Sequence, residues 1–359
     1  MGDGLLRLER QVELRFAGDT VRTGNHVNLS AVHVEGSTVW LAGDETATVE
    51  RLELDPALAV AGKPVSFPLA ELVRLPGPPE QEADVEGLAR GGGFLWVVGS
   101  HSLKRRRVKP DHDAARALKR LAKVRREENR YVLARLAVEA YTEGPPELVL
   151  RTAAGVCSAL VGARGGVGLA DLLADDPRLG PFLHIPGKDN GFDVEGLAVH
   201  GESVYVGLRG PVLRGWAVVL ELLPQPDPAD DGRLLLGAFP GGERYRTHLL
   251  DLGGLGVRDL CPHGDDLLVL AGPSMALSGP VRLHRWRDAA TSDAPLLVRR
   301  DRLPLLGELP HGQGEDHAEG IALLPGAGPP RLLVVHDSPG RDRRPTPSSV
   351  LADVVALDG

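Results

Sequence analysis

Acidic and polar residues recur in this sequence at a constant distance from an aromatic residue. Ten positions separate the members of each pair, which are Ser30 and Trp40, Glu86 and Trp96, and Glu195 and Tyr205. Two looser copies of the surrounding pattern place Arg258 and Glu319 at the equivalent position. Two residues before these five positions lie Asn28, Asp84, Asp193, Gly256 and His317. Because side chains two apart in a strand share one side, we expect both sets to converge if the copies are structural repeats.

Several carboxyl groups in one site from which water is excluded cannot all ionise without a positively charged partner. A divalent cation is one such partner, and oxygen ligands with a single imidazole favour Ca²⁺, Mg²⁺ or Mn²⁺ over zinc. The expected metal ligands are Glu86, Asp193, Glu195 and Glu319. Arg258 is the other partner. In that alternative the carboxylates form a hydrogen-bonded network that holds neighbouring repeats together without a metal.

A metal among these carboxylates would suit hydrolysis of an ester, a lactone or a phosphoester, because the ion polarises the substrate and activates water. We expect His101 or His317 to transfer the proton and Arg209 to grip a carboxylate or phosphate group. The residues expected to contact a small polar or anionic ligand are Asn28, Ser30, Asp84, Lys188, Asn190, Arg258 and Asp337. The competing hypothesis is a non-catalytic binding or interaction scaffold, in which the same residues only join the repeats.

Each copy of the pattern predicts a short strand, a glycine-bearing turn and a second strand rich in β-branched and aromatic residues. Copies begin near residues 28, 84, 193, 256 and 317, and a third strand usually follows. Fourth strands are expected at 147–150, 234–239 and 296–300. Antiparallel strands repeating in this way are typical of β-propeller blades. We therefore predict an all-β, single-domain, five-bladed β-propeller over residues 1–359, with six blades as the alternative.

The long interval between the second and third copies predicts two insertions in the second blade. Residues 103–130 form a basic helical insertion, and residues 152–190 form a Gly-rich insertion with a short helix. The Gly-rich part, 162–168, matches neither a phosphate loop nor a dinucleotide fingerprint, so no nucleotide cofactor is expected. A strand at 5–16 precedes the first copy, and we expect pairing of the two chain ends to close the ring of blades.

Two segments resemble a bacterial family. They run from Lys188 to Ala198, Lys-Asp-Asn-Gly-Phe-Asp-Val-Glu-Gly-Leu-Ala, and from Gly207 to Ala217, Gly-Leu-Arg-Gly-Pro-Val-Leu-Arg-Gly-Trp-Ala. The sequence resembles the family filed as domain of unknown function 3616, over most of its length. This resemblance implies a propeller-like fold and assigns no reaction. Through the repeated Asp-x-Glu-Gly-Leu-Ala, the sequence is also similar, more distantly, to esterase-like phytases and lactonase-type propellers.

The net charge is −8, from 41 basic and 49 acidic side chains, so the chain as a whole is not a polyanion binder. Arginine supplies 35 of the basic residues and lysine 6, a bias typical of GC-rich bacterial genomes. Two cysteines cannot make a disulfide framework, and no apolar run approaches the roughly 18 residues that span a bilayer. We expect a cytoplasmic protein with no membrane partner, and the sequence does not determine its oligomeric state.

The basic insertion concentrates charge of one sign. Residues 103–130 carry 12 basic and 4 acidic side chains, a net +8, so the rest of the chain carries −8 minus 8, or −16. A helix from about Asp113 is expected, with apolar and basic residues on opposite faces. Three interpretations stay open: a lid or funnel for an anionic ligand, a contact with nucleic-acid phosphate, and a helix lying on the acidic body with its charged side solvated. Contact with nucleic acid is the least favoured interpretation, because residues 103–130 of the insertion contain no aromatic stacking residue before Tyr131.

Overall fold

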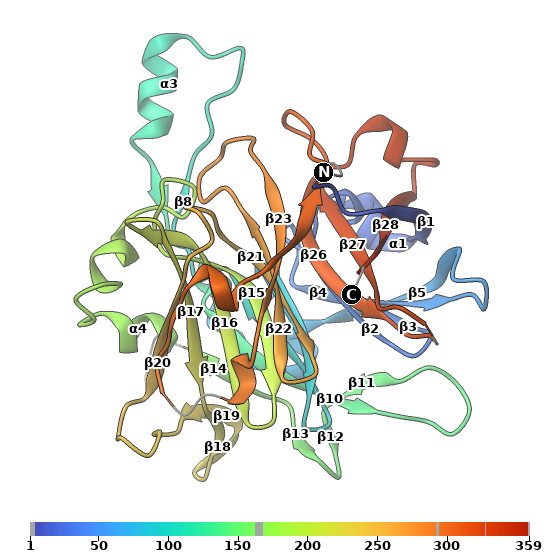
Figure 1. Ribbon diagram of the computed structural model, residues 1–359, viewed down its shortest axis with the longest axis horizontal. Helices are drawn as coiled ribbons and strands as arrows, with labels where there is room; N and C mark the ends of the chain where they lie inside the picture. The colour runs from blue at the N-terminus through green and yellow to red at the C-terminus, as the bar shows by residue number, and fades with distance from the viewer. Residues whose placement is uncertain (1–3, 162–167, 292–293, 327, 358–359) are drawn as a thin grey trace.

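The computed structural model describes residues 4–161, 168–291, 294–326 and 328–357, which form a β-rich body with one projecting hairpin (Figure 1). Its main strands pair into five antiparallel four-stranded units. Unit 1 contains β2 (Leu29–Glu35), β3 (Thr38–Gly43), β4 (Thr48–Leu54) and β5 (Val60–Pro68). Unit 2 contains β6 (Val85–Gly91), β7 (Phe94–Gly99), β10 (Val132–Glu139) and β14 (Ser158–Val161). Unit 3 contains β15 (Asp193–His200), β16 (Ser203–Leu213), β17 (Trp216–Leu222) and β20 (Tyr245–Leu250).

The last two units follow the same order. Unit 4 contains β21 (Gly256–His263), β22 (Asp266–Gly272), β23 (Val281–Trp286) and β25 (Leu305–Leu309). Unit 5 contains β26 (His317–Leu324), β27 (Arg331–Asp337), β28 (Ser349–Ala356) and the N-terminal β1 (Leu8–Arg15). The N-terminal strand is therefore the outer strand of the last unit, as expected. A short parallel contact between β1 and β5 joins the last unit to the first, so these two sheet edges cover each other.

The first strand of every unit lies at the centre of the molecule. β2 lies against β6, β6 against β15, β15 against β21, β21 against β26, and β26 against β2. The inner strands thus form a closed ring from which the sheets extend outward. This all-β, propeller-like arrangement agrees with the repeat pattern in the sequence.

Glycine in the repeated motif allows the inner strands to approach one another. A Cβ atom on Gly87 would lie 2.5 Å from Cβ of Leu197 on the neighbouring inner strand, and one on Gly196 would lie 3.1 Å from Cγ of Leu260. Contacts this close force a neighbour to move, because protein interiors are close-packed. The spacing of the ring therefore explains why these positions are glycine.

Apolar side chains fill the space between neighbouring sheets. The matched aromatic residues Trp40, Trp96 and Tyr205 are all buried. Their equivalent places on the second strand of units 1, 2 and 3 make each of them part of the packing between sheets. The recurrence of these residues in the sequence is thus a signal of the core rather than of a binding surface.

The outer strands differ from the prediction. Units 2, 3 and 4 end in β14, β20 and β25, whereas the predicted segments form β11 (Glu147–Val149), part of β19 (Asp230–Leu236) and β24 (Leu297–Val298). β19 pairs with β18 (Pro224–Asp227) and with β14, and β24 runs parallel to β20. Several short apolar runs compete for each outer edge, and only the geometry of the third strand decides between them.

The segment 152–190 only partly leaves the second sheet. It contains the end of a small hairpin, β12 (Arg151–Thr152) and β13 (Gly155–Val156), and then β14, which belongs to unit 2. After it come α4 (Leu169–Leu173), the short helix that the sequence predicts, and the 3₁₀ turn η3 (Gly180–His184). Residues 162–167 of the Gly-rich part lie outside the described residues.

The remaining helices are short. They are α1 (Gly18–Arg22), α2 (Leu69–Leu72), α3 (Ala114–Leu121) and the 3₁₀ turns η1 (Asn25–Val27), η2 (Glu128–Arg130), η4 (Ala289–Thr291), η5 (Arg300–Arg302) and η6 (Arg341–Arg343). Within the described ranges, no helix combines the length and the apolar character that crossing a bilayer requires. Cys157 and Cys261 are buried and unpaired.

Candidate functional site

The five positions selected by the repeat are β-bulges. The register between each inner strand and the second strand of its unit breaks at Ser30, Glu86, Glu195, Arg258 or Glu319, and unit 3 has a second break between Asp193 and Val194. A bulge bends the strand and re-aims the side chain of the extra residue. Because the bulges lie at equivalent places, they gather these side chains at one end of the ring of inner strands.

Arg258 links three units at this end of the ring. Its Nη1 donates to Glu195 Oε2 at 3.0 Å and to Glu319 Oε1 at 2.7 Å, and its Nη2 donates to the carbonyl oxygen of Pro273 at 3.2 Å. All three partners accept from a guanidinium that is only 8% exposed. The structure therefore contains the arginine-centred network that the sequence offered as the alternative to a metal.

Arg209, expected to grip a substrate, is held by carboxylates of the protein. Its Nη2 lies 2.5 Å from Asp193 Oδ2 and its Nη1 lies 2.5 Å from Glu195 Oε1. Burial alone would lower the pKa of this guanidinium, but Asp193 and Glu195 raise it above its ordinary value. The two nitrogens that would grip a substrate are thus already occupied.

Arg130 is a buried residue of this site that the sequence analysis placed in the basic insertion. Its guanidinium lies 2.5 Å from Asp84 Oδ2 and 2.6 Å from Glu82 Oε1, and its Nε lies 3.0 Å from Glu127 Oε2. The available signal in the sequence was that Arg130 follows the acidic Glu127 by three residues and lies two residues before the third strand of unit 2. Arg130 is therefore paired with carboxylates at the rim and is not part of the exposed basic surface.

Three of the residues expected to bind a ligand are engaged by backbone groups. Asn28 Nδ2 donates to the carbonyl oxygen of Gly24, and Asn190 Oδ1 accepts from the backbone N–H of Val212. The hydroxyl of Ser30 donates to the carbonyl oxygen of Val85 on the neighbouring inner strand. Through these contacts the three side chains hold loops and neighbouring units together.

Glu86 differs from the other two glutamates at the bulges. Within the described part of the chain, its carboxyl group forms neither a hydrogen bond nor an ion pair, whereas Glu195 and Glu319 both contact Arg258. Burial, and then the charges of Asp84, Glu195, Glu319 and Asp44, raise its pKa well above the ordinary value. This shift favours the protonated form of Glu86, which can donate a hydrogen bond.

Asp44 follows β3 and belongs to the same cluster. Its Oδ1 is buried and has no partner among the described atoms. Burial, and then the charges of Asp84 and Asp337, raise the pKa of Asp44 to about 8. Burial and Asp337 likewise raise the pKa of Glu319 to about 7, although Arg258 opposes the shift.

The charges at this end of the ring do not balance. The rim cluster comprises seven carboxyl groups and four cations: Asp44, Asp84, Glu86, Asp193, Glu195, Glu319 and Asp337, with Arg130, Lys188, Arg209 and Arg258. Lys188 is exposed. Burial raises the pKa of Asp193, Glu195, Glu319 and Asp337, and the charge of Lys188 opposes this rise. Because cations are in the minority, protons on some carboxyl groups complete the compensation.

The two candidate histidines have different surroundings. His101 is buried with Nδ1 2.8 Å from the carbonyl oxygen of Gly99, its ring packs against Tyr131, and burial lowers its pKa to about 4. The contacts described for this ring include no rim carboxylate, so the structure does not place it in the cluster. His317, at the start of β26, lies beside Arg258, and burial followed by the charges of Arg258 and Lys188 lowers its pKa. His317 is therefore neutral at pH 7 and can accept a proton.

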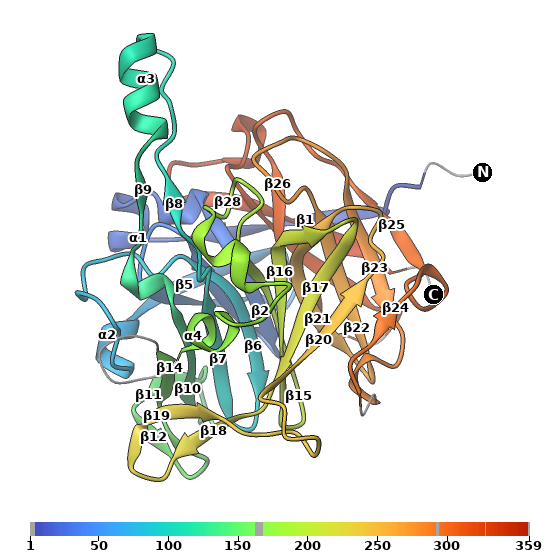
Figure 2. The same cartoon turned by 90° about the vertical axis from the view of Figure 1, so that its left-hand side faces the viewer.

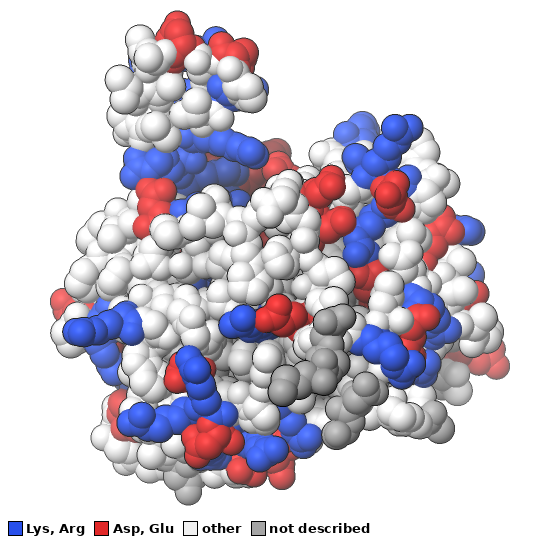
Figure 3. All heavy atoms as spheres, turned by 45° about the horizontal axis from the view of Figure 1, so that its top comes forward, with Lys and Arg blue, Asp and Glu red and all other residues white. Residues whose placement is uncertain are grey.

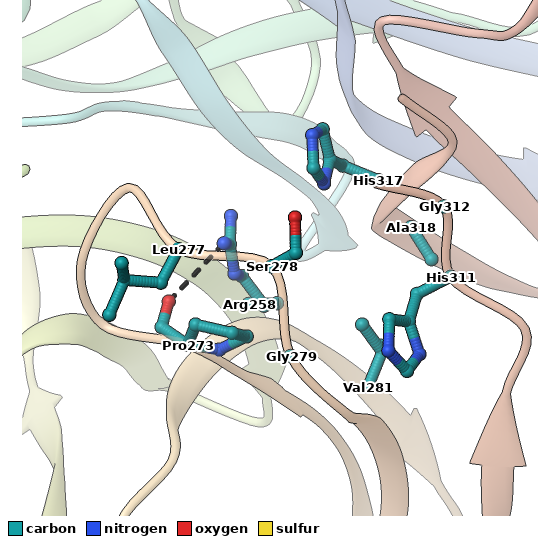
Figure 4. A pocket seen from close by; sticks show the side chains of 10 residues that line it. All are labelled: Arg258, Pro273, Leu277, Ser278, Gly279, Val281, His311, Gly312, His317 and Ala318. Carbon is teal, nitrogen blue, oxygen red and sulfur yellow. Dashed lines mark hydrogen bonds between the residues drawn. The ribbon is translucent and has the colours of Figure 1, made fainter. Parts of the chain in front are cut away.

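A small cleft opens beside Arg258 and His317. Figure 4 shows the His317 ring and the Arg258 guanidinium on one side of it, with His311 across the gap. Pro273, Leu277, Ser278, Gly279, Val281, Gly312 and Ala318 complete the lining. The cleft holds about 10 Å³, which is room for one water-sized group. A larger ligand must therefore lie above the rim cluster rather than inside this cleft.

The donor set at the rim does not fit a metal well. Over the described ranges, no three His, Cys, Asp or Glu side chains group in a way that could hold a metal ion. Arg258 lies between Glu195 and Glu319, and Arg209 lies between Asp193 and Glu195. These guanidinium groups supply the positive charge that a metal would supply. Binding of Ca²⁺, Mg²⁺ or Mn²⁺ stays a prediction, and no chemical step is derived from it.

A family model described as "Protein of unknown function (DUF3616)" matches residues 28–353, which include every bulge residue. The chain belongs to this family. No curated protein matches it. The match gives the family of the DUF3616 chain but no activity. The rim residues all lie within the matched residues 28–353.

Solved structures similar to this DUF3616 protein include glutaminyl cyclase from Myxococcus xanthus, at 12% identity and a TM-score of 0.42 over 99% of this chain and 98% of that chain. Aldose sugar dehydrogenase from Streptomyces coelicolor, bound to PQQ, has 12% identity and a TM-score of 0.39 over 98% and 97%. Virginiamycin B lyase from Staphylococcus aureus has 10% identity and a TM-score of 0.36 over 97% and 99%. At these scores we draw nothing about the chemistry of the DUF3616 site.

The unbalanced carboxyl groups of this DUF3616 protein make its stability depend on pH. A carboxyl group whose pKa is raised by folding favours the folded state at low pH, and this contribution is lost as pH rises to the folded pKa. For Asp44, with a pKa of about 8, we expect Asp44→Asn to increase the free energy of unfolding. The gain should grow from about pH 4, level off above about pH 8, and reach about 2 kcal/mol or more at pH 9.

Urea denaturation at pH 5, 7 and 9 measures this gain. Asp111→Asn is the matched control, because Asp111 is exposed on the basic insertion and should show the same stability as wild type at each pH. An Asp44→Asn gain that is equal at pH 5 and pH 9 would contradict the proton-holding role of Asp44.

Proposed function

We propose that the five four-stranded units are the blades of a five-bladed propeller, and that the rim cluster binds a small polar molecule and hydrolyses it. The observation that supports the site is Glu86. It is the bulge carboxyl group without a partner in the described structure, whereas the other two bulge glutamates, Glu195 and Glu319, are held by arginine. A protonated carboxylic acid in such surroundings is a hydrogen-bond donor and a general acid.

Backbone geometry supports a functional assignment of the same rim. Asp84, Asn190 and Ser338 have φ values of 50°, 64° and 51°, in the left-handed region that residues other than glycine seldom adopt. Asp84 belongs to the rim cluster, Ser338 directly follows Asp337, and Asn190 lies two residues after Lys188. Strained backbone that persists next to a cluster of unbalanced charges is typical of binding sites.

The charges of the rim cluster narrow the ligand class. Arg130, Arg209 and Arg258 are bound to carboxylates, so Lys188 is the cation of the cluster that is free to meet a ligand, among the described ion pairs. A multiply charged anion such as a phosphoester would face seven carboxyl groups with one lysine to receive it. The balance therefore favours an ester or lactone that is neutral or carries one charge.

The expected reaction follows from the charge states. Neutral His317 accepts a proton from a water molecule, whose oxygen then attacks the ester or lactone carbonyl carbon. Lys188 stabilises the negative charge that develops on the carbonyl oxygen. As the bond from carbon to the leaving oxygen breaks, Glu86 donates its proton to that oxygen. Exchange with solvent returns one proton to Glu86 and removes one from His317, so the cycle balances.

A panel of esters and lactones tests this proposal. We expect Glu86→Gln to lower kcat/KM by at least about 100-fold, because the amide cannot donate a proton to the leaving group. Glu202→Gln, at an exposed hairpin turn, is the matched control and should keep wild-type kcat/KM. Chelator treatment should leave the rate unchanged, and restoration by Ca²⁺, Mg²⁺ or Mn²⁺ after a loss would instead support the metal-assisted form. Wild-type rates in Glu86→Gln would rule out the acid role.

The second candidate is a non-catalytic binding scaffold, which the arginine network favours. Arg258 joins units 3, 4 and 5, while Arg130 and Arg209 tie strands together within units 2 and 3. If no member of the panel is hydrolysed by the wild-type protein, the catalytic proposal fails. A small-molecule thermal-shift screen of wild type and Glu86→Gln then tests binding alone. Ligands that stabilise only the wild type would place binding at Glu86.

A further inference from the structure

The basic insertion is a stalk that projects from the body. We define the stalk as residues 103–126, comprising β8 (Lys104–Arg105), α3 (Ala114–Leu121) and β9 (Val124–Arg125), where β8 and β9 pair to form its neck. Figures 1 and 2 show α3 standing clear of the body in both views. No residue of α3 is buried. The interpretation that this helix lies on the acidic body is therefore wrong.

The base of the stalk is tied to the body by ion pairs. Lys104 contacts Glu82 and Arg105 contacts Asp189, while the guanidinium of Arg126 lies over the Tyr131 ring. The side chain of Asp113 accepts from the backbone N–H of Arg116 and caps α3, as the sequence predicts. The stalk thus has a defined root and a formed helix, and its direction is not that of a lid folded over the rim.

The rest of the stalk has basic charge without acidic partners. Within the described chain, no ion pair is formed by its remaining basic side chains, which are Arg106, Arg107, Lys109, Arg116, Lys119, Arg120, Lys123 and Arg125. Figure 3 shows this basic surface between the helix and the body. Such a concentration of like charge attracts an anionic surface over roughly one Debye length, about 8–10 Å at physiological salt.

The stalk also exposes apolar side chains on one face. Leu118 is 69% exposed, Leu121 is 42% exposed and Val124 is 41% exposed. In α3 the spacing places Leu118 and Leu121 on one side, with Arg116 and Lys119 on the opposite side. A basic helix with exposed leucines is the pattern of helices that lie in the interface of a membrane.

We propose that the stalk binds the surface of a membrane rich in anionic lipids. The basic residues would meet lipid phosphate groups, and Leu118, Leu121 and Val124 would enter the headgroup boundary. Residues 103–126 carry 11 basic and 2 acidic side chains, a net +9, so the remaining chain carries −8 minus 9, or −17, and the neck holds it away from a surface of the same sign. The expectation of no membrane partner rested on the absence of a spanning segment, and a peripheral contact needs none.

Two other partners fit the stalk less well. Nucleic acid is disfavoured because residues 103–126 contain no Phe, Tyr or Trp to stack on bases. A second copy of the chain is disfavoured on the face shown in Figure 3, where acidic side chains of the body are interleaved with basic ones. Nucleic acid would also leave the exposed leucines unused.

Vesicle sedimentation tests the proposal with the full chain. Wild type should bind phosphatidylcholine vesicles containing about 30% phosphatidylglycerol at least about 10-fold more tightly than pure phosphatidylcholine vesicles, and about 0.5 M NaCl should abolish the difference. The charge-reversal variant R116E/K119E/R120E should lose this preference. The apolar variant L118D/L121D should bind at least about 5-fold more weakly than wild type. Melting temperatures should not change, because none of these side chains is buried.

The matched control reverses three exposed arginines on the body, R299E/R341E/R344E, which changes net charge equally and should keep vesicle binding. Equal loss in this control would overturn the stalk as the binding surface. Absence of wild-type binding to anionic vesicles would overturn the proposal, as would tighter binding of duplex DNA than of vesicles. A dimer in light scattering that R116E/K119E/R120E dissociates would point to a second copy instead. None of these outcomes depends on the rim site.

Discussion

Replacing Arg258 by methionine is expected to lower the free energy of unfolding by about 3–5 kcal/mol at pH 7. The substitution keeps the length of the side chain but removes the donor shared by Glu195 and Glu319, at 3.0 Å and 2.7 Å. Those carboxyl groups would then be buried without a partner from unit 4, and removing one member of a buried ion pair leaves the other uncompensated. Urea denaturation at pH 7 measures the loss.

Two further measurements make this result specific to the buried network. Arg151→Met is the matched control, because Arg151 pairs with Asp231 at the surface, where the two side chains are 65% and 70% exposed, and its loss should be at most about 1 kcal/mol. Glu319→Gln should restore part of the stability lost in Arg258→Met, because it removes one of the uncompensated charges. Equal losses in Arg258→Met and Arg151→Met would contradict a central role for Arg258.

Substitution of Gly87 by alanine is expected to cost about 2–3 kcal/mol, a large effect for one methyl group. The added Cβ would lie 2.5 Å from Cβ of Leu197, 2.9 Å from Cγ1 of Val98 and 3.1 Å from the backbone nitrogen of Leu197. Relief requires the inner strands β6 and β15 to separate. Because Glu86 is the adjacent bulge residue, the same movement should also weaken ligand binding at the rim.

Gly62→Ala is the matched control for Gly87→Ala. Gly62 lies in β5, an outer strand, and a Cβ there would meet nothing within 4 Å. We expect the stability of Gly62→Ala to be within about 0.5 kcal/mol of wild type. A Gly87→Ala protein as stable as Gly62→Ala would show that the ring of inner strands can expand, contrary to its close packing.

The positions of the bulges could be predicted from the sequence because the local pattern is enough to define them. The copies repeat the order of a strand, a turn and a second strand, so Glu86, Glu195 and Glu319 occupy equivalent positions in the sequence alone. The β-bulge itself was not predicted, since its signal is a register break between two strands. The Glu-Gly pair at these three positions was the available clue, because the glycine accommodates the neighbouring strand.

Outer elements could not be predicted in the same way. The segments 147–150, 234–239 and 296–300 have the composition of fourth strands, yet β14, β20 and β25 take those places. An outer strand packs on one side only, so its apolar pattern is weak and several segments satisfy it. The direction of the stalk was open for a similar reason, because an amphipathic helix does not itself show whether its apolar face is covered.

The sequence by itself determined the repeat, the all-β class, the glycines of the inner ring and the convergence of carboxylates at one end of it. These follow from local periodicity, which each copy carries within a few residues. Only the tertiary structure decided which cation serves which carboxylate. Arg209 lies on the second strand of unit 3 and Arg130 lies just before the third strand of unit 2, and their pairing with Asp193, Glu195 and Asp84 depends on distances between strands of the same unit. In the described structure that pairing leaves Glu86 without a partner. For this reason we propose a protonated carboxyl group, rather than a metal ion, as the reactive group of the site.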